Sequence, residues 1–271
     1  MHLLTYVNWA VEPEIFSIGA IHVRWYGVLF ASGFLLGYLM LYKIFLNEKE
    51  SPENAEKLLI YMMVSVIVGA RLGHVIFYDW DYYSENLGEI VMIWKGGLAS
   101  HGATIAILIA LWIYSKRVIK KPMLWILDRA TGGVAIGAAF VRLGNLMNHE
   151  IVGKVTDVSW AFKFSRIDNL PRHPVQLYEF ISYVLICVLM NFMYWKTSAK
   201  DKPGLMFGTL LITLFGARFF IEIFKRSQGG FEVFLGNVLS TGQWLSIPLI
   251  LIGVFFIVRA LKKPDLTSSI Q

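Results

Sequence analysis

Long apolar runs, rather than alternating apolar and polar positions, dominate this chain of 271 residues. A helix needs about 20 mostly apolar residues to cross the hydrocarbon core of a bilayer. Seven stretches meet this requirement and are predicted to be spanning helices: 24–45, 58–78, 97–115, 123–143, 178–195, 204–224 and 242–261. The pattern therefore predicts an all-α integral membrane protein whose two termini lie on opposite sides of the membrane.

The composition agrees with this fold class. Hydrophobic residues make up 56% of the chain and charged residues only 16%, whereas soluble domains carry about 25% charged residues. The net charge of +6 is typical of a membrane protein with basic cytoplasmic loops. The chain has no basic run interleaved with aromatic residues, so nucleic-acid binding is not indicated.

The single cysteine, Cys187, excludes an internal disulfide. The first residues lack a basic start followed by an apolar core, so no cleavable signal peptide is predicted.

The distribution of lysine and arginine among the loops predicts the orientation. One set of short loops contains 13 of these residues and the opposite set, which includes longer loops, contains eight. Because cytoplasmic loops are enriched in lysine and arginine, we expect the N-terminus outside and the C-terminus in the cytoplasm. We expect one polytopic domain over 1–271, with a small extracytoplasmic cap at 144–177, where strand-like pieces, prolines and polar turns occur between the fourth and fifth spans.

Polar residues crowd the end of the fourth span, in the sequence FVRLGNLMNHEIVG at 140–153. Arg142, Asn145 and Glu150 follow a run of small apolar residues, and Gly153 permits a tight turn or a close approach of the backbone. A charge at membrane depth is costly and indicates function. One interpretation is an Arg142–Glu150 ion pair that closes the loop. The other is a guanidinium presented to an anionic lipid head group.

Two further groups of polar residues are candidates for the site. Arg218 and Glu222 are four residues apart, so they share a helix face and are predicted to form an ion pair, which could also aim the arginine at a phosphate. His101 and Tyr26 lie at the outer ends of the third and first spans, where each is either a structural residue or a participant in proton transfer. Arg71 is either an anchor near a helix end or a functional charge.

Neither a metal centre nor a protein nucleophile is predicted. The six histidines form no pair with i, i+4 spacing and no HExxH motif. There is no GxSxG motif, and Cys187 lies inside an apolar run. If the chain is an enzyme, the attacking group is therefore expected to come from the substrate.

The sequence VRLGNLMNHEIVG closely resembles the signature of the prolipoprotein diacylglyceryl transferase family of bacterial inner membranes. Further matches extend along nearly the whole chain: RWYG, GGLASHGA, RHPVQLYE, ARFFIEIFKR and STGQWLSIP. The resemblance implies seven spans and transfer of the diacylglyceryl group of phosphatidylglycerol to the lipobox cysteine thiol in the signal peptide of a prolipoprotein. A thioether forms, glycerol phosphate leaves, and no cofactor is needed.

The resemblance also implies roles for particular residues. Arg142, Asn145, Glu150 and Gly153 match substrate-binding positions, and Tyr26, His101, Arg218 and Glu222 match the other functional positions, with Arg218 binding the phosphate as well. The chain departs from the family pattern at Ser100 and Ala103, beside the histidine, and at Leu214, where a tyrosine is common. The competing class is a lipid or anion transporter or flippase; a membrane scaffold is a third, for which charge at membrane depth is unfavourable.

Overall fold

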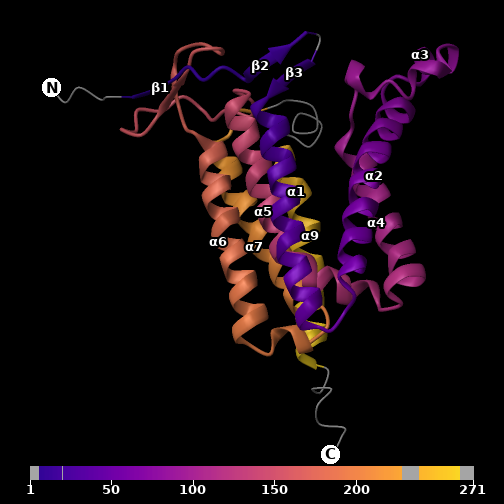
Figure 1. The fold of residues 1–271 in the computed structure, drawn as a ribbon. Coiled ribbons are helices and arrows are strands. Elements are labelled where there is room, and N and C mark those ends of the chain that lie inside the picture. The colour runs from indigo at the N-terminus through magenta and orange to yellow at the C-terminus, as the bar shows by residue number, and fades with distance from the viewer. Residues whose placement is uncertain (1–5, 20, 228–237, 263–271) are drawn as a thin grey trace, which may run out of the picture. The chain divides into compact units, whose positions relative to one another are not determined.

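The computed structural model describes residues 6–19, 21–227 and 238–262 (Figure 1). Within these ranges seven helices are long and apolar enough to cross a membrane. They are α1 (Trp25–Asn47), α2 (Pro52–Phe77), α4 (Ser100–Tyr114) with its continuation to Ile119, α5 (Met123–Met147), α6 (Val175–Lys196), α7 (Leu205–Ile221) with the 3₁₀ turn η5 (Glu222–Phe224), and α9 (Thr241–Lys262). Each contains most of one predicted span, so the predicted fold class is confirmed, and the ends differ by up to six residues.

The chain forms two compact units, one made of residues 41–126 and the other of residues 1–40 together with 127–271. In the first unit, α2 and α4 pack closely because glycine residues form their contact. A Cβ atom added to Gly69 would lie 2.6 Å from the backbone oxygen of Gly102, and one added to Gly73 would lie 2.6 Å from the Cα of Gly102. Small residues allow this approach of two helix backbones, which is a common way to associate helices in a membrane.

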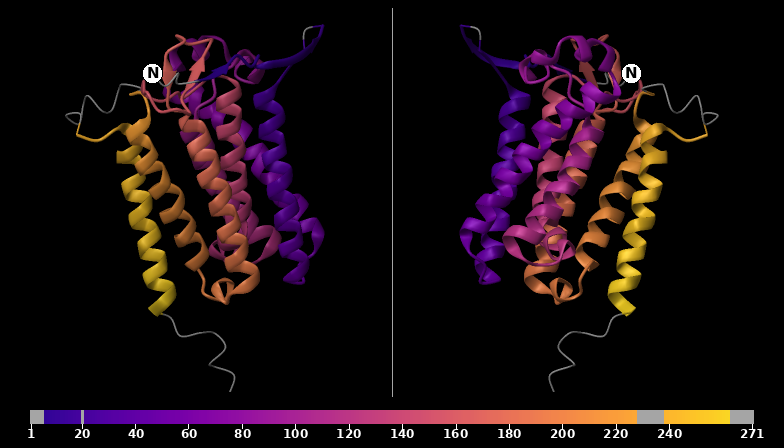
Figure 2. Two further views of the ribbon diagram at one scale, coloured as in Figure 1. Left: turned by 90° about the vertical axis from the view of Figure 1, so that its left-hand side faces the viewer. Right: turned by 90° about the vertical axis from the view of Figure 1, so that its right-hand side faces the viewer.

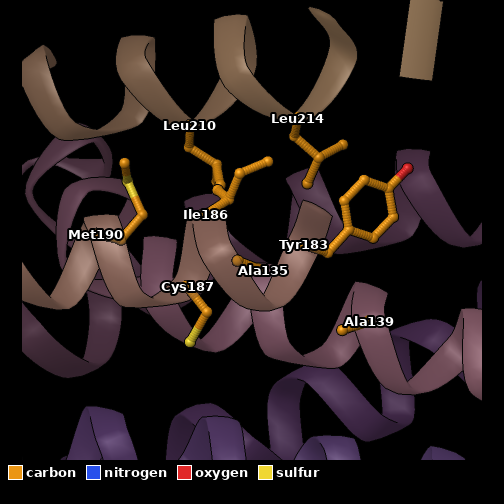
Figure 3. Close-up of a cluster of buried hydrophobic side chains, with 8 residues drawn as sticks. All are labelled: Ala135, Ala139, Tyr183, Ile186, Cys187, Met190, Leu210 and Leu214. Carbon is orange, nitrogen blue, oxygen red and sulfur yellow. The ribbon is translucent and has the colours of Figure 1, made fainter. Parts of the chain in front are cut away.

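The other unit contains α5, α6, α7, α9 and the N-terminal part of α1. Figure 2 shows α7 and α9 side by side in both views. Buried apolar side chains of α5, α6 and α7 form its core (Figure 3): Ala135, Ala139, Tyr183, Ile186, Cys187, Met190, Leu210 and Leu214. Cys187 is thus a buried core residue, as its apolar surroundings in the sequence predict.

A buried carboxylate fixes the start of α7 in this unit. Asp128 of α5 has no exposed surface, and its two carboxylate oxygens accept hydrogen bonds from the backbone N–H groups of Gly204 (2.7 Å) and Phe207 (2.9 Å). These N–H groups have no partner inside the helix because the first turn lacks preceding carbonyls. Asp128 therefore caps α7 from a neighbouring helix, and α7 in turn carries Arg218.

Short strands accompany the helices near the end of α5 and the start of α6 (Figure 1). The strand β4 (Phe162–Phe164) pairs antiparallel with β5 (Pro171–Arg172) and parallel with β1 (Val7–Trp9). A separate hairpin, β2 (Glu14–Ile18) and β3 (Ile21–Arg24), leads directly into α1. The strand-like character predicted within 144–177 is confirmed, but the addition of β1 from the N-terminal segment to the same sheet was not predicted.

Candidate active site

The last two turns of α5 place Arg142 and Asn145 on one face of the helix, because residues three apart are neighbours there. Nη1 of Arg142 donates a hydrogen bond to Oδ1 of Asn145 at 3.1 Å. Nε of Arg142 lies 2.9 Å from Oε2 of Glu179, which is in the second turn of α6. The Glu179 side chain has no exposed surface and that of Arg142 is 15% exposed. The guanidinium is thus held by a neutral amide on its own helix and by a buried carboxylate on the next one.

The loop after α5 positions Glu150 beside this pair. Nδ2 of Asn145 donates to Oε2 of Glu150 at 2.9 Å, and Nδ2 of Asn148 donates to Oε1 at 3.1 Å. The structure does not contain the Arg142–Glu150 ion pair considered above. Among the described residues, the carboxylate partner of Arg142 is Glu179, and the Asn145 amide connects Arg142 to the exposed Glu150.

The same loop adopts a strained backbone. His149 and Ile151 have φ angles of +57° and +54°, a region that non-glycine residues rarely occupy, least of all β-branched ones. Nε2 of His149 lies 2.9 Å from the backbone oxygen of Val11, and Nε2 of Gln176 donates to the backbone oxygen of Glu150 at 2.6 Å. Such strain persists only where the surroundings enforce it, and these contacts from the N-terminal segment and α6 do so.

The i, i+4 spacing predicted an ion pair between Glu222 and Arg218, and the structure does not contain it among the described residues. Oε2 of Glu222 lies 2.9 Å from Nζ of Lys225. The reason is local: α7 ends at Ile221 and the chain continues in the 3₁₀ turn η5, in which residues three apart eclipse each other. This turn brings Lys225 to the face of Glu222. The predicted ion pair with Arg218 is therefore wrong, although both residues lie in the same unit.

Lys225 also binds the carboxylate that holds Arg142. Its Nζ donates to Oε1 of Glu179 at 3.0 Å, and the side chain is only 7% exposed. Arg142, Glu179, Lys225 and Glu222 therefore form one chain of alternating charges, which we call the buried ion chain.

Arg218 lies close to the buried ion chain without being neutralised by it. Its Nε is buried and has no hydrogen-bond partner among the described residues, and no ion pair to a described carboxylate is formed. Tyr183, whose hydroxyl donates to Oε1 of Glu179 at 3.3 Å, lies within electrostatic range of both Arg142 and Arg218. Among the described residues, Arg218 is thus a guanidinium without a carboxylate partner beside the buried ion chain, which suits an anionic ligand.

Two glycines of the signature are explained by close contacts. A Cβ atom on Gly144 would lie 2.8 Å from the ring of Tyr26, so this glycine lets the tyrosine at the start of α1 pack on α5. A Cβ atom on Gly153 would lie 2.4 Å from the backbone oxygen of His173 and 3.0 Å from that of Phe224. Gly153 thus permits close packing of three backbone segments, and its predicted contact with a ligand stays a prediction.

His101 belongs to the other unit, at the second residue of α4. Its Nε2 lies 2.6 Å from the hydroxyl of Tyr78, and the two rings stack with their centroids 5.6 Å apart. The histidine is exposed. Its predicted role as proton acceptor stays a prediction, and the hydrogen bond to Tyr78 is a contact that the sequence motif did not indicate.

The segment next to Gly153 has perturbed acid–base properties. The guanidinium of Arg172, which donates to Asp168, holds the pKa of that carboxyl below its ordinary value. Burial lowers the pKa of His173. Arg172 also donates to the backbone oxygen of Gly153 at 3.0 Å, so this ion pair supports the loop that carries Glu150.

Sequence reasoning indicated Glu179 without its partner, and it missed Lys225 as a residue of the site. The motif RHPVQLYE placed a glutamate at the edge of a span, where a charge requires a partner, but not which partner. Lys225 was counted among the loop cations, and no local pattern separates a buried lysine from an exposed one just beyond a helix end.

Known proteins resemble the chain over almost its full length. The family model described as prolipoprotein diacylglyceryl transferase matches residues 13–259. A phosphatidylglycerol–prolipoprotein diacylglyceryl transferase of Chloroherpeton thalassium is 46% identical over 98% of both chains. Those of Tolumonas auensis and Bacteroides fragilis are 44% and 41% identical, over 94% of this chain and 98% and 95% of their own. The chain belongs to the prolipoprotein diacylglyceryl transferase family.

Proposed function

We propose that this membrane transferase moves the diacylglyceryl group of phosphatidylglycerol to the cysteine thiol of a prolipoprotein. Its relatives bear the name of this reaction. The observation that carries the proposal to particular residues is the unneutralised Arg218 beside the buried ion chain. A phosphodiester lipid has a single negative charge, which a guanidinium without a carboxylate partner can bind.

The proposed chemistry is a displacement at carbon. The cysteine sulfur forms a bond to the terminal glycerol carbon of the diacylglyceryl group, and the bond between that carbon and the phosphate oxygen breaks. Glycerol phosphate leaves with the bonding electron pair and gains negative charge. The thiol must lose its proton, because the thiolate is the nucleophile and a free cysteine has a pKa of about 8.5.

Arg142 and Arg218 are proposed to bind the phosphate. Guanidinium groups fixed in place before the reaction stabilise the charge that develops on a leaving group, and they do so most strongly where water is scarce. Asn145 fixes Nη1 of Arg142, and Glu150 is held at the rim by two asparagine amides. Because Glu222 binds Lys225 rather than Arg218, we assign Glu222 to the support of the buried ion chain.

His101, with Tyr26, is proposed to accept the thiol proton or to settle the head group. Tyr26, at the start of α1, packs against Gly144 of α5, within electrostatic range of Arg142 and Glu150. If His101 is the base, replacement by glutamine removes most of the turnover between pH 6 and pH 9. Near-normal turnover of His101→Gln over this range would remove it from the mechanism.

The chain is a multi-pass membrane protein, and we propose the bacterial inner membrane as its location. The loop charges described above support an outer N-terminus and a cytoplasmic C-terminus. In this orientation residues 144–177 form the extracytoplasmic cap, and the end of α5 lies where head groups meet hydrocarbon. The phosphatidylglycerol of the outer leaflet and the signal peptide of the prolipoprotein then meet at the same depth.

The decisive experiment incubates the purified protein with phosphatidylglycerol vesicles and a lipobox peptide, followed by mass spectrometry of the peptide. Transfer adds the mass of one diacylglyceryl group to the peptide and releases glycerol phosphate. A lipid transporter, which the relatives do not favour, would move phosphatidylglycerol between leaflets and leave the peptide mass unchanged. A peptide whose cysteine is replaced by serine is the matched control.

A further inference from the structure

Lys225 occupies an unusual place for a lysine. Its side chain is 7% exposed and lies between two carboxylates from different elements, Glu179 on α6 and Glu222 in η5, at 3.0 and 2.9 Å. Lysine is rarely buried unless it is paired. The ammonium pairs with both carboxylates, so its removal would leave Glu179 and Glu222 without this cationic partner.

The backbone of Lys225 is fixed as well. Lys225 forms an antiparallel bridge with Gly153. On either side of it, the N–H of Lys154 donates to the oxygen of Phe224 at 2.8 Å, and the N–H of Arg226 donates to the oxygen of Val152 at 3.2 Å. The backbone of Lys225 is therefore bound to the loop that follows α5, and this restricts the positions that the ammonium can reach.

Glu179 connects this fixed ammonium to the phosphate-binding arginine. One of its oxygens, Oε1, binds Lys225, and the other, Oε2, lies 2.9 Å from Nε of Arg142. A carboxylate shared in this way is restrained at both oxygens. Without Lys225, Arg142 would be the one described ion partner left to Glu179, and in surroundings of low dielectric this attraction is strong.

We propose that Lys225 is a positioning residue for the transfer reaction, which rests on the proposed function. The ammonium neutralises and orients Glu179, so that Arg142 is paired at Nε and keeps for the lipid phosphate the N–H groups that Glu179 and Asn145 do not hold. Lys225 itself does not touch the lipid. Loss of the ammonium makes Glu179 compete with the phosphate for Arg142, which weakens lipid binding more than it slows the chemical step.

The test compares three variants: Lys225→Met, Lys225→Arg and the double variant Lys225→Met/Glu179→Gln. Transfer to a lipobox peptide is measured as a function of phosphatidylglycerol concentration, and thermal unfolding is measured in the same detergent. We expect Lys225→Met to raise the KM for phosphatidylglycerol by about tenfold or more, with a smaller change in kcat. Lys225→Arg retains the positive charge and stays within about threefold of the original KM.

The double variant distinguishes positioning from direct contact. It removes the ammonium together with the carboxylate that Arg142 binds, so Glu179 can no longer compete with the phosphate, and the KM is expected to recover most of the loss. Glu222 loses its partner Lys225 in both variants, so the comparison between them isolates Glu179. Removing both partners of a buried pair is also far less destabilising than removing one, so this variant supplies the measurement if Lys225→Met does not fold.

Two results would overturn the proposal. One is a folded Lys225→Met protein with an unchanged KM, which would leave Lys225 a purely structural residue. The other is a double variant no better than Lys225→Met, which would indicate that the ammonium binds the lipid directly. If the original protein transfers nothing to the peptide, the proposed function fails instead, and this is seen before any variant is made.

Discussion

Two arginines within candidate spanning helices, Arg71 in one unit and Arg142 in the other, have opposite surroundings. Arg71, which is 3% exposed, donates from all three of its nitrogens to backbone oxygens. The acceptors are the carbonyls of Glu89, Ile90, Gly96 and Gly97, at 2.6 to 3.3 Å. Its guanidinium also lies over the Tyr83 ring, 4.9 Å from the centroid. By contrast, Arg142 faces a carboxylate and a side-chain amide.

The difference shows that burial alone does not identify a ligand-binding arginine. A guanidinium has five N–H donors. At Arg71 four backbone carbonyls accept from these donors and thereby fix the segment between α2 and α4, so the side chain does not extend to solvent as an interfacial anchor would. Near Arg142 the side chains hold the guanidinium by its edge, and Arg218 has no carboxylate partner among the described residues. The N–H donors without a protein acceptor are the ones that can bind a ligand.

The same substitution at the two arginines should separate these roles, and the largest effect is expected at Arg142. Arg142→Lys keeps the charge but loses the planar fork, so kcat/KM for transfer should fall by about 100-fold to 1,000-fold. The unfolding temperature should hardly change, because the ammonium can still pair with Glu179. Transfer kinetics and thermal unfolding of the purified variant provide the measurement. Normal lipid binding and turnover would contradict bidentate recognition of the phosphate.

Arg71→Lys should give the reverse result. An ammonium cannot reach four carbonyls spread around a planar guanidinium, so several charge-assisted hydrogen bonds are lost, and the expected cost is about 3 kcal/mol of stability. Transfer activity per folded molecule should stay within about threefold of the original. A variant as stable as the original protein would show that the carbonyl contacts of Arg71 contribute little.

A smaller effect is expected where α9 touches the buried ion chain. A Cβ atom on Gly242 would lie 2.4 Å from Cδ of Glu222, so Gly242→Ala should push this carboxylate away from Lys225. We expect transfer to fall by about tenfold, which corresponds to 1.4 kcal/mol of activation free energy. The matched control is Gly216→Ala in α7, where an added Cβ meets nothing within 4 Å and activity should be unchanged. Equal activities of the two variants would show that the position of Glu222 is unimportant.

The sequence predicted the helices far better than it predicted the partners of the charges. Spanning helices follow from apolar length alone, because backbone groups in hydrocarbon must bond within the segment. The pairing of Glu222 depended on where α7 turns into η5, and the pairing of Glu179 with Lys225 joins residues 46 apart in sequence. Such contacts follow from the packing of α6 against the end of α7. Local spacing contains no information about that packing.

The weakest expected effect concerns pH and the segment that supports the Glu150 loop. Because burial lowers the pKa of His173 below its ordinary 6.5, the unfolded chain binds a proton at this residue before the folded chain does. Stability should therefore fall as the pH drops below 6.5 and level off below the folded pKa. His173→Gln should flatten this slope in thermal unfolding between pH 7 and pH 5.

The ion pair of Asp168 contributes to stability in a different pH range. Because the pKa of this carboxyl is lowered from 3.8, its contribution is lost only in more acidic solution. Asp168→Asn should thus reduce stability equally at pH 7 and pH 5, and a change of slope in this variant, rather than in His173→Gln, would contradict the assignment.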